Sequence, residues 1–348
     1  MKNENTIDLV KFIFSLMIVA IHVPVLCGDY QEYNFIISNG IARIGVPFFF
    51  IAGSYFLFKK LNGNYSWTNI KVYFFKLLRL YCVWSVIYFI PSITLAIFQK
   101  HPVPLGELAS LYLRNFLFEG ISFHLWYLNT TIVCTFVFIL VLKRFKRNSI
   151  LLGLSLLFFA LGGVFNTYYN SSMVCDLISA VDLFNSHTYT MSFTFPLYWM
   201  IFIYFGFKLS NNEMSIQLKQ SCALFTISII LLYCELSVID LYQLSRGHSI
   251  MMSLAPCGLF IFVASKKKKL NNAECYRTLR YLSTLIYLLH PLVWLIINNM
   301  YRTFNIENDI PFLSYTIVVS ITLFLSMIII KFSKSSRPLC RSLSTLYK

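Results

Sequence analysis

Three histidines and one arginine stand out because they lie in or at the start of apolar runs that predict membrane-spanning segments. His22, Arg43 and His290 lie within such runs, and His124 comes just before Trp126 at the start of another. Ionisable groups inside a bilayer are costly and are functional candidates by default. An imidazole can take a proton from a hydroxyl, and a guanidinium can stabilise a developing oxyanion. The alternative is a purely structural role. The residues inside the spans would then each make a hydrogen bond to another helix or to the backbone, and His124 would merely lie in an aromatic belt at the membrane interface.

The first apolar segment carries the most informative spacing. Lys11 and His22 are eleven residues apart, so a helix places them on one face, roughly 16 Å apart along its axis. A lysine at the cytoplasmic end of this helix could hold a phosphate of a CoA-type donor. The pantetheine arm of such a donor is about as long as the distance from Lys11 to His22. The alternative is that Lys11 only extends its ammonium to the interface.

These residues require a membrane-spanning scaffold. Hydrophobic residues make up 57% of the 348 positions and charged residues only 12%, whereas soluble domains average about a quarter charged. Apolar runs of about twenty residues match the length that crosses a bilayer, and lipid admits only helices or closed barrels. We predict an all-α polytopic bundle with ten transmembrane helices, near 8–27, 37–58, 73–98, 123–142, 150–166, 191–208, 220–237, 250–264, 278–299 and 312–332.

The net charge of +15 reflects topology rather than nucleic-acid binding. With both termini cytoplasmic, 24 of the 29 Lys and Arg residues fall on the inner side, whereas ten of the 14 acidic residues fall outside. This is the positive-inside bias, and anionic lipids are a further expected contact. We expect the lipid bilayer, and no nucleic acid, as a partner.

The chain is expected to be one domain over residues 1–348, with a short amphipathic stretch from Leu105 to Phe118 that lies on the outer membrane surface. Nine scattered cysteines without a Cys-x-x-Cys motif indicate no disulfide framework. We predict no metal site and no permanently bound cofactor.

Taken together, five motifs resemble the acyltransferase-3 family of membrane acyltransferases, in order and over essentially the whole chain. The motifs are Lys11 to His22, Arg43 to Gly53, Lys76-Leu77-Leu78-Arg79-Leu80-Tyr81, His124-Leu125-Trp126-Tyr127 and Leu288-Leu289-His290-Pro291. The local pattern is also similar to the membrane half of vancomycin-resistance serine racemases. Two departures are a lysine at position 11, where the family has an arginine that grips phosphate with two hydrogen bonds, and Ala52-Gly53-Ser54 in place of Ser-Gly-aromatic.

The resemblance implies a membrane-bound O-acyltransferase of a bacterial cytoplasmic membrane. Its co-substrate is expected to be cytoplasmic acyl-CoA, most often acetyl-CoA, and its acceptor a hydroxyl of a cell-surface carbohydrate or lipid-linked sugar. The implied roles are catalysis by His22 and Arg43, binding of the donor phosphates by Lys11 and Arg79, and shaping of the acceptor side by His124, Trp126 and His290. A small-molecule carrier with Arg43 on a substrate carboxylate, and a scaffold subunit, remain alternatives.

Overall fold

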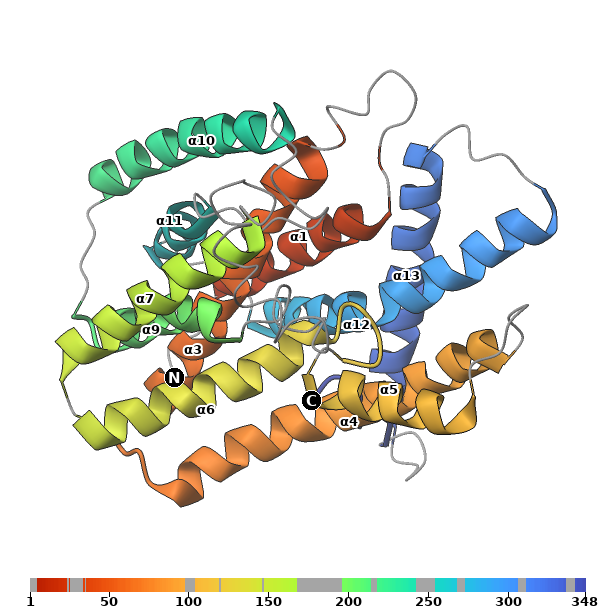
Figure 1. Ribbon diagram of the computed structural model, residues 1–348, viewed down its shortest axis with the longest axis horizontal. Coiled ribbons are helices and arrows are strands. Elements are labelled where there is room, and N and C mark those ends of the chain that lie inside the picture. The colour runs from red at the N-terminus through yellow and green to blue at the C-terminus, as the bar shows by residue number, and fades with distance from the viewer. Residues whose placement is uncertain are drawn as a thin grey trace.

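The structure is a computed structural model, and the residues that it describes form helices without strands. It describes residues 5–23, 25, 34, 36–97, 104–118, 120–145, 147–167, 196–213, 218–241, 254–267, 273–305, 311–335 and 342–348. Within this part of the chain, eleven α-helices and four short 3-10 or π turns follow one another (Figure 1).

Each of the ten predicted spans overlaps with one α-helix, although residues 24, 26–27, 98, 191–195 and 250–253 of those spans lie outside the described residues. The helices are α1 (Asn5–His22), α3 (Gly45–Leu61), α4 (Trp67–Ile97), α6 (Trp126–Phe145), α7 (Asn148–Thr167), α9 (Met200–Ser210), α10 (Leu218–Leu241), α11 (Leu254–Lys267), α12 (Ala273–Thr303) and α13 (Pro311–Ser333). Six spans are long and apolar enough to cross a membrane, and α7, α9, α10 and α11 are shorter apolar helices. The predicted all-helical polytopic membrane bundle is confirmed.

The second predicted span is not one continuous helix. A π turn η2 (Ile36–Ile41) and a 3-10 turn η3 (Ala42–Ile44) precede α3, so Arg43 lies in the 3-10 turn. Pro47 lies in the first turn of α3, where a backbone N–H has no acceptor within the helix, so the absence of an N–H in proline breaks no hydrogen bond of α3. The proline therefore marks the beginning of a helix rather than a kink within one.

Two further helix ends differ from the prediction. The first helix ends at His22 rather than continuing to residue 27, because Pro24 disfavours helical geometry in the residue before it. The helix α6 begins at Trp126, so His124 lies in the turn that leads into it.

The amphipathic stretch forms α5 (Leu105–Phe118), and this helix packs against the bundle. The Tyr81 hydroxyl of α4 donates a hydrogen bond to the Phe116 carbonyl, and the Asn129 side-chain amide of α6 donates to the Leu117 carbonyl at 2.9 Å. Figure 1 shows α5 alongside α4. These bonds hold its carboxyl end beside the turn that carries His124.

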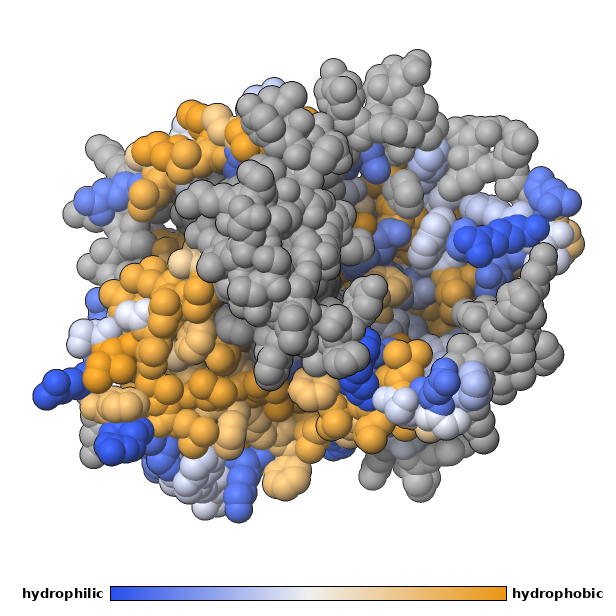
Figure 2. Space-filling view, viewed as in Figure 1, coloured by the Kyte–Doolittle hydropathy of each residue, from blue (hydrophilic) through white to orange (hydrophobic). Residues whose placement is uncertain are grey.

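Two clusters of buried side chains hold the helices together. One joins α3, α6, α9 and α11 around large aromatic residues such as Phe48, Phe58 and Phe202, and the other joins α1, α4, α12 and α13 around Trp84 and Leu285. Helices α3 and α9 form one of the closest pairs, and α1 and α12 the other. Figure 2 shows the outer face of the first group as a broad apolar surface with hydrophilic residues along its rim, as expected for a face in contact with lipid.

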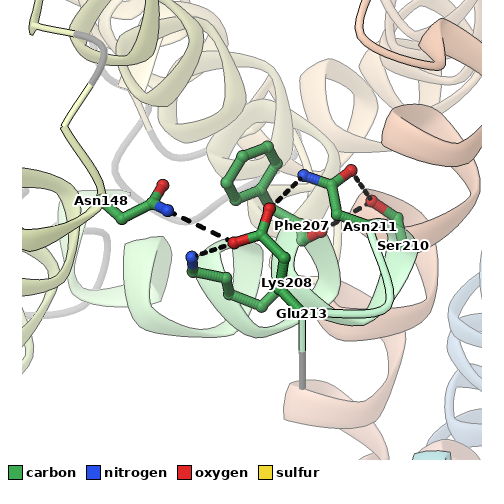
Figure 3. Close-up of polar contacts among 6 residues, drawn as sticks. All are labelled: Asn148, Phe207, Lys208, Ser210, Asn211 and Glu213. Carbon is green, nitrogen blue, oxygen red and sulfur yellow. Dashed lines mark hydrogen bonds and ion pairs between the residues drawn. The ribbon is translucent and has the colours of Figure 1, made fainter. Parts of the chain in front are cut away.

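The end of α9 is fastened by polar contacts around one carboxylate (Figure 3). Glu213 accepts hydrogen bonds from Lys208 at 2.5 Å, from Asn211 at 3.0 Å and from Asn148 of α7 at 3.3 Å. The hydrogen bond from Lys208, followed by that from Asn211, lowers the pKa of Glu213. This exposed cluster ties the ends of α7 and α9 together at the lysine-rich end of the bundle, which the positive-inside rule assigns to the cytoplasm.

Gly206 is the small residue on which the α3–α9 contact depends. A methyl group there would lie 1.9 Å from Ser54 Oγ and 2.5 Å from the Ile51 carbonyl oxygen. We expect Gly206→Ala to lower the free energy of unfolding by about 1–3 kcal/mol through overpacking. Thermal unfolding in detergent measures the change.

Gly153 of α7 is the matched control, because a methyl group there meets no described atom within 4 Å. Alanine in place of this helical glycine should stabilise the protein by about 0.5–1 kcal/mol. Equal effects of the two substitutions would contradict the assigned helix contact.

The Glu213 cluster predicts a pH-dependent contribution to stability. A folded-state pKa below the usual 4.5 means that the contribution is present above pH 4.5 and is lost as the pH falls through the folded value. The difference in melting temperature between wild type and Glu213→Gln should therefore be constant near neutral pH and shrink in acid. Glu274→Gln, which alters an exposed carboxylate at the start of α12, is the control. A difference that grows in acid would contradict the prediction.

Candidate active site

One cavity of about 1360 Å³ runs between α1, α3, α4, α5, α6 and α12. Lys60, at the last turn of α3, and Arg43, just before its first, both line it. These two positions are seventeen residues apart, or about 25 Å along a helix. The cavity therefore extends along the whole length of α3.

The lysine-rich end of this cavity is a ring of cations. Lys11, Lys60, Lys76 and Arg280 line it, and none of the described lining residues is an Asp or Glu. The Lys11 ammonium lies 4.6 Å from the centre of the Phe56 ring, which favours a cation. A mouth with this charge attracts anions, phosphates above all.

The opposite end holds three histidines from three different helices or turns. The ring centres of His22 and His290 lie 5.5 Å apart in a stacked arrangement, and those of His124 and His290 lie 6.0 Å apart. Phe123 covers the other side of His22, with ring centres 4.6 Å apart. His22 and His124 line the cavity, whereas His290 is fully buried behind them.

Hydrogen bonding fixes the tautomer of His290. Its Nδ1 lies 2.8 Å from the Ile286 carbonyl oxygen, and because a carbonyl only accepts, Nδ1 carries the proton. The neutral ring then presents Nε2 as a bare acceptor, which is buried without a hydrogen-bond partner in the described part of the chain. A buried acceptor of this kind is costly unless a donor completes it.

Tyr88 of α4 contacts the backbone of α12 next to this histidine. The Tyr88 hydroxyl donates to the Leu288 carbonyl at 2.7 Å and accepts from the Leu292 N–H at 3.2 Å. The hydroxyl thus bridges two groups that would bond directly in a regular helix, beside Pro291, which has no N–H to give. The Tyr88 hydroxyl therefore supports the backbone of α12 beside Pro291 and His290, within a helix that is continuous from Ala273 to Thr303.

A tight turn holds His124. Gly120 has φ +92°, a left-handed conformation that favours glycine, and a methyl group added there would lie 3.0 Å from the Leu125 carbonyl carbon. The His124 carbonyl accepts a 2.5 Å hydrogen bond from the Tyr287 hydroxyl of α12. His124 Nδ1 lies 3.1 Å from Ser122 Oγ, and its Nε2 is buried with no hydrogen-bond partner among the described residues.

Arg43 and Trp126 complete the wall of the cavity. Arg43 is 7% exposed and comes from the 3-10 turn before α3. Trp126 packs against Trp199 with ring centres 5.4 Å apart. The site therefore combines buried imidazoles, a guanidinium and an aromatic wall with a cationic mouth, an arrangement that suits acyl transfer from a phosphate-bearing donor to a hydroxyl.

The cavity brings together five of the seven residues that the sequence singled out: Lys11, His22, Arg43, His124 and Trp126. His290 stands behind the wall, in ring contact with two of them. Arg79 is exposed on α4 and does not line the cavity, whereas Lys76, one turn earlier, does. In the described residues, no group of three His, Cys, Asp or Glu side chains is arranged to hold a metal ion.

Sequence reasoning missed Tyr88, Tyr287 and Arg280. The tyrosines resemble ordinary interfacial aromatic residues, and Arg280 resembles any basic residue at a cytoplasmic helix end. The signal for Arg280 was Asp8: this carboxylate is 1% exposed in the first turn of α1 and accepts hydrogen bonds from Arg280 at 2.8 and 2.5 Å. A carboxylate at the start of a membrane helix requires such a partner.

Comparison with known proteins identifies relatives of this helix bundle. The chain is similar to an amino-acid racemase of Enterococcus faecalis, with 25% identity over 96% of this chain and 47% of that protein. It is also similar to a serine/alanine racemase of Enterococcus gallinarum, with 26% identity over 84% of this chain and 41% of that protein. The chain thus spans less than half the length of these curated relatives. No solved structure matches it.

Residues 4–331 match the acyltransferase domain of the acyltransferase-3 family, which covers all ten helices that resemble membrane spans. The protein is therefore a multi-pass membrane protein of the acyltransferase-3 family.

Proposed function

We propose that this protein is an O-acyltransferase that moves an acetyl group from cytoplasmic acetyl-CoA to a hydroxyl of a cell-surface carbohydrate. The observation that carries the proposal is a cavity with Lys11, Lys60, Lys76 and Arg280 at one end and His22 at the other. Along both α1 and α12, the cation and the histidine are about 15–16 Å apart. Eleven residues separate Lys11 from His22, and ten separate Arg280 from His290. A pantetheine arm that starts at the cationic mouth reaches the imidazoles over such a distance.

In the proposed reaction, the neutral His22 imidazole takes the proton from the acceptor hydroxyl. The oxygen attacks the thioester carbonyl carbon, and Arg43 stabilises the resulting oxyanion. The carbon–sulfur bond then breaks, and the thiolate of CoA recovers the proton from the His22 imidazolium. The products are the acetyl ester and free CoA, and no further reactant is needed.

The acceptor is proposed to bind beside His124, which lines the cavity and has a buried Nε2 without a described partner. A sugar hydroxyl supplies the missing donor, and His290, buried behind the cavity wall, shapes this end through its ring contacts with the other two histidines. Trp126 provides an apolar wall next to them. At the other end, Lys11 is proposed to meet the donor phosphates, with the exposed Arg79 at the rim of the mouth.

The names of the relatives support a second candidate function. Both are amino-acid racemases that extend well beyond the region shared with this chain. A membrane carrier for a small amino acid would use Arg43 to bind the substrate carboxylate and would need no CoA. The two functions differ in the ligand that stabilises the purified protein.

His22→Asn should abolish acetyl transfer and leave donor binding intact, because the variant loses the general base but keeps the cationic mouth. The measurement is incorporation of label from radioactive acetyl-CoA into surface carbohydrate of cells that carry the variant. Thermal stabilisation of the purified variant by acetyl-CoA should match that of the wild type.

Thr303→Ala, at the outer end of α12 and outside the cavity, is the control and should transfer normally. Normal labelling with His22→Asn would exclude the proposed base. Stabilisation of the wild type by serine, with none by acetyl-CoA, would support the carrier instead.

Gly120→Ala tests the acceptor side. A methyl group at position 120 would lie 2.8 Å from Leu125 Cβ and 3.0 Å from its carbonyl carbon, in a backbone conformation that alanine rarely adopts. The turn that carries His124 must therefore move, and we expect a loss of at least about tenfold in transfer rate, since small displacements of catalytic groups are costly.

Gly106→Ala in α5 is the matched control, because a methyl group there meets no described atom within 4 Å. The KM for acetyl-CoA should stay unchanged in both variants. Full activity of Gly120→Ala would show that the position of His124 is unimportant.

A further inference from the structure

The turn η5 (Leu343–Leu346) and the two residues after it are built into the cationic mouth of the cavity. The Trp84 indole N–H of α4 donates to the Leu346 carbonyl at 2.9 Å. The Tyr347 hydroxyl and Ser333 Oγ of α13 lie 2.6 Å apart. These two bonds fix Tyr347, which is 5% exposed and lines the cavity.

Tyr347 forms an aromatic pair with Tyr281 of α12. Their ring centres lie 4.8 Å apart, and Tyr281 also lines the cavity. The Lys348 ammonium lies 5.6 Å from the centre of each ring. The mouth therefore combines flat aromatic surface with positive charge.

Arg280 is held in place beside this pair. Asp8 accepts two hydrogen bonds from its guanidinium, through Nε and one terminal nitrogen, and Asp8 is itself buried. The Arg280 side chain is half exposed and lines the cavity, so its remaining N–H groups are open to a ligand. Lys76 also lines the cavity here and is repelled by the charges of Lys60 and Arg79, and then by those of Arg280 and Lys348. An anion bound at this end would reduce that repulsion.

We propose that this mouth is a purine-nucleotide subsite, in which the Tyr281–Tyr347 pair packs against the base and Arg280, Lys76 and Lys348 pair with its phosphates. Aromatic side chains bind bases through their π-faces, and Arg pairs with phosphate through directed hydrogen bonds. A simple anion, or the headgroup of an acidic lipid, would need the cations but not the aromatic pair. The inference rests on the proposed function and assigns the nucleotide part of the acyl donor to residues of α12 and the 342–348 segment.

The test compares two donors that differ only in the nucleotide, acetyl-CoA and S-acetylpantetheine. Tyr347→Leu should raise the KM for acetyl-CoA about tenfold, because it removes the aromatic surface for the base. The KM for S-acetylpantetheine, and kcat with both donors, should stay as in the wild type. Tyr347→Phe, which keeps the ring and loses the hydroxyl contact with Ser333, should raise the KM for acetyl-CoA much less than Tyr347→Leu does.

Tyr233→Leu on α10 is the matched control, because Tyr233 is exposed and does not line the cavity. A parallel rise of KM for both donors, or no rise for either, would overturn the subsite. Lys348→Gln should also raise the KM for acetyl-CoA alone, whereas Lys334→Gln, an exposed lysine after α13, should not.

A binding measurement separates this inference from the proposed reaction. Adenosine bisphosphate, the nucleotide fragment of CoA, should raise the melting temperature of wild type and Tyr347→Phe but not of Tyr347→Leu. That result supports the subsite even if no acetyl transfer is measured, in which case only the proposed reaction fails. Equal stabilisation of all three proteins, or equal stabilisation by inorganic phosphate, would show a simple anion site and overturn the inference.

Discussion

The packing of α1 against α12 is the contact on which the rest of the site depends. The two helices run in the same direction, and they meet at Asp8 with Arg280 at one end and at His22 with His290 at the other. A bidentate ion pair in a membrane helix fixes both the register and the rotation of the two helices. The same contact therefore sets the charge of the mouth, the stacking of the imidazoles and the distance between them.

The bilayer explains why these polar groups share one cavity. Hydrocarbon offers no hydrogen-bond partners, so ionisable side chains in membrane helices turn inward, toward each other or toward water. Here three lysines and Arg280 gather at one end, and the histidines lie at the other with Arg43 in the wall beside them. Hydroxyl groups of Tyr88 and Tyr287 then donate hydrogen bonds to backbone carbonyls, one in α12 near Pro291 and one in the turn that carries His124. The resulting asymmetry suits a donor that carries its charge at one end and its reactive group at the other.

The number and order of the helices, and most of the cavity, could be predicted from the sequence. Length and hydrophobicity determine a membrane helix almost alone, and a spacing of eleven residues determines a shared face, so Lys11 and His22 were predicted together. Contacts between distant segments could not be predicted in the same way. Arg79 and Lys76 lie one turn apart, and only the packing of α4 decides that Lys76 lines the cavity. Tyr347 and Tyr281 are 66 positions apart in the sequence, and no local sequence pattern predicts their contact. The role of each side chain likewise depends on its hydrogen-bond partners and neighbours in the folded protein, which the spacing of residues in the sequence does not show.

The central claim is that one acyl donor occupies the cavity from the cationic mouth to His22. The most direct measurement is a structure of the protein with a bound, non-hydrolysable acetyl-CoA analogue in lipid nanodiscs. The account predicts phosphates among Lys11, Lys76 and Arg280, and the carbonyl group of the analogue beside the His22 imidazole. An analogue bound outside the cavity, or one whose carbonyl group lies far from that ring, would contradict it.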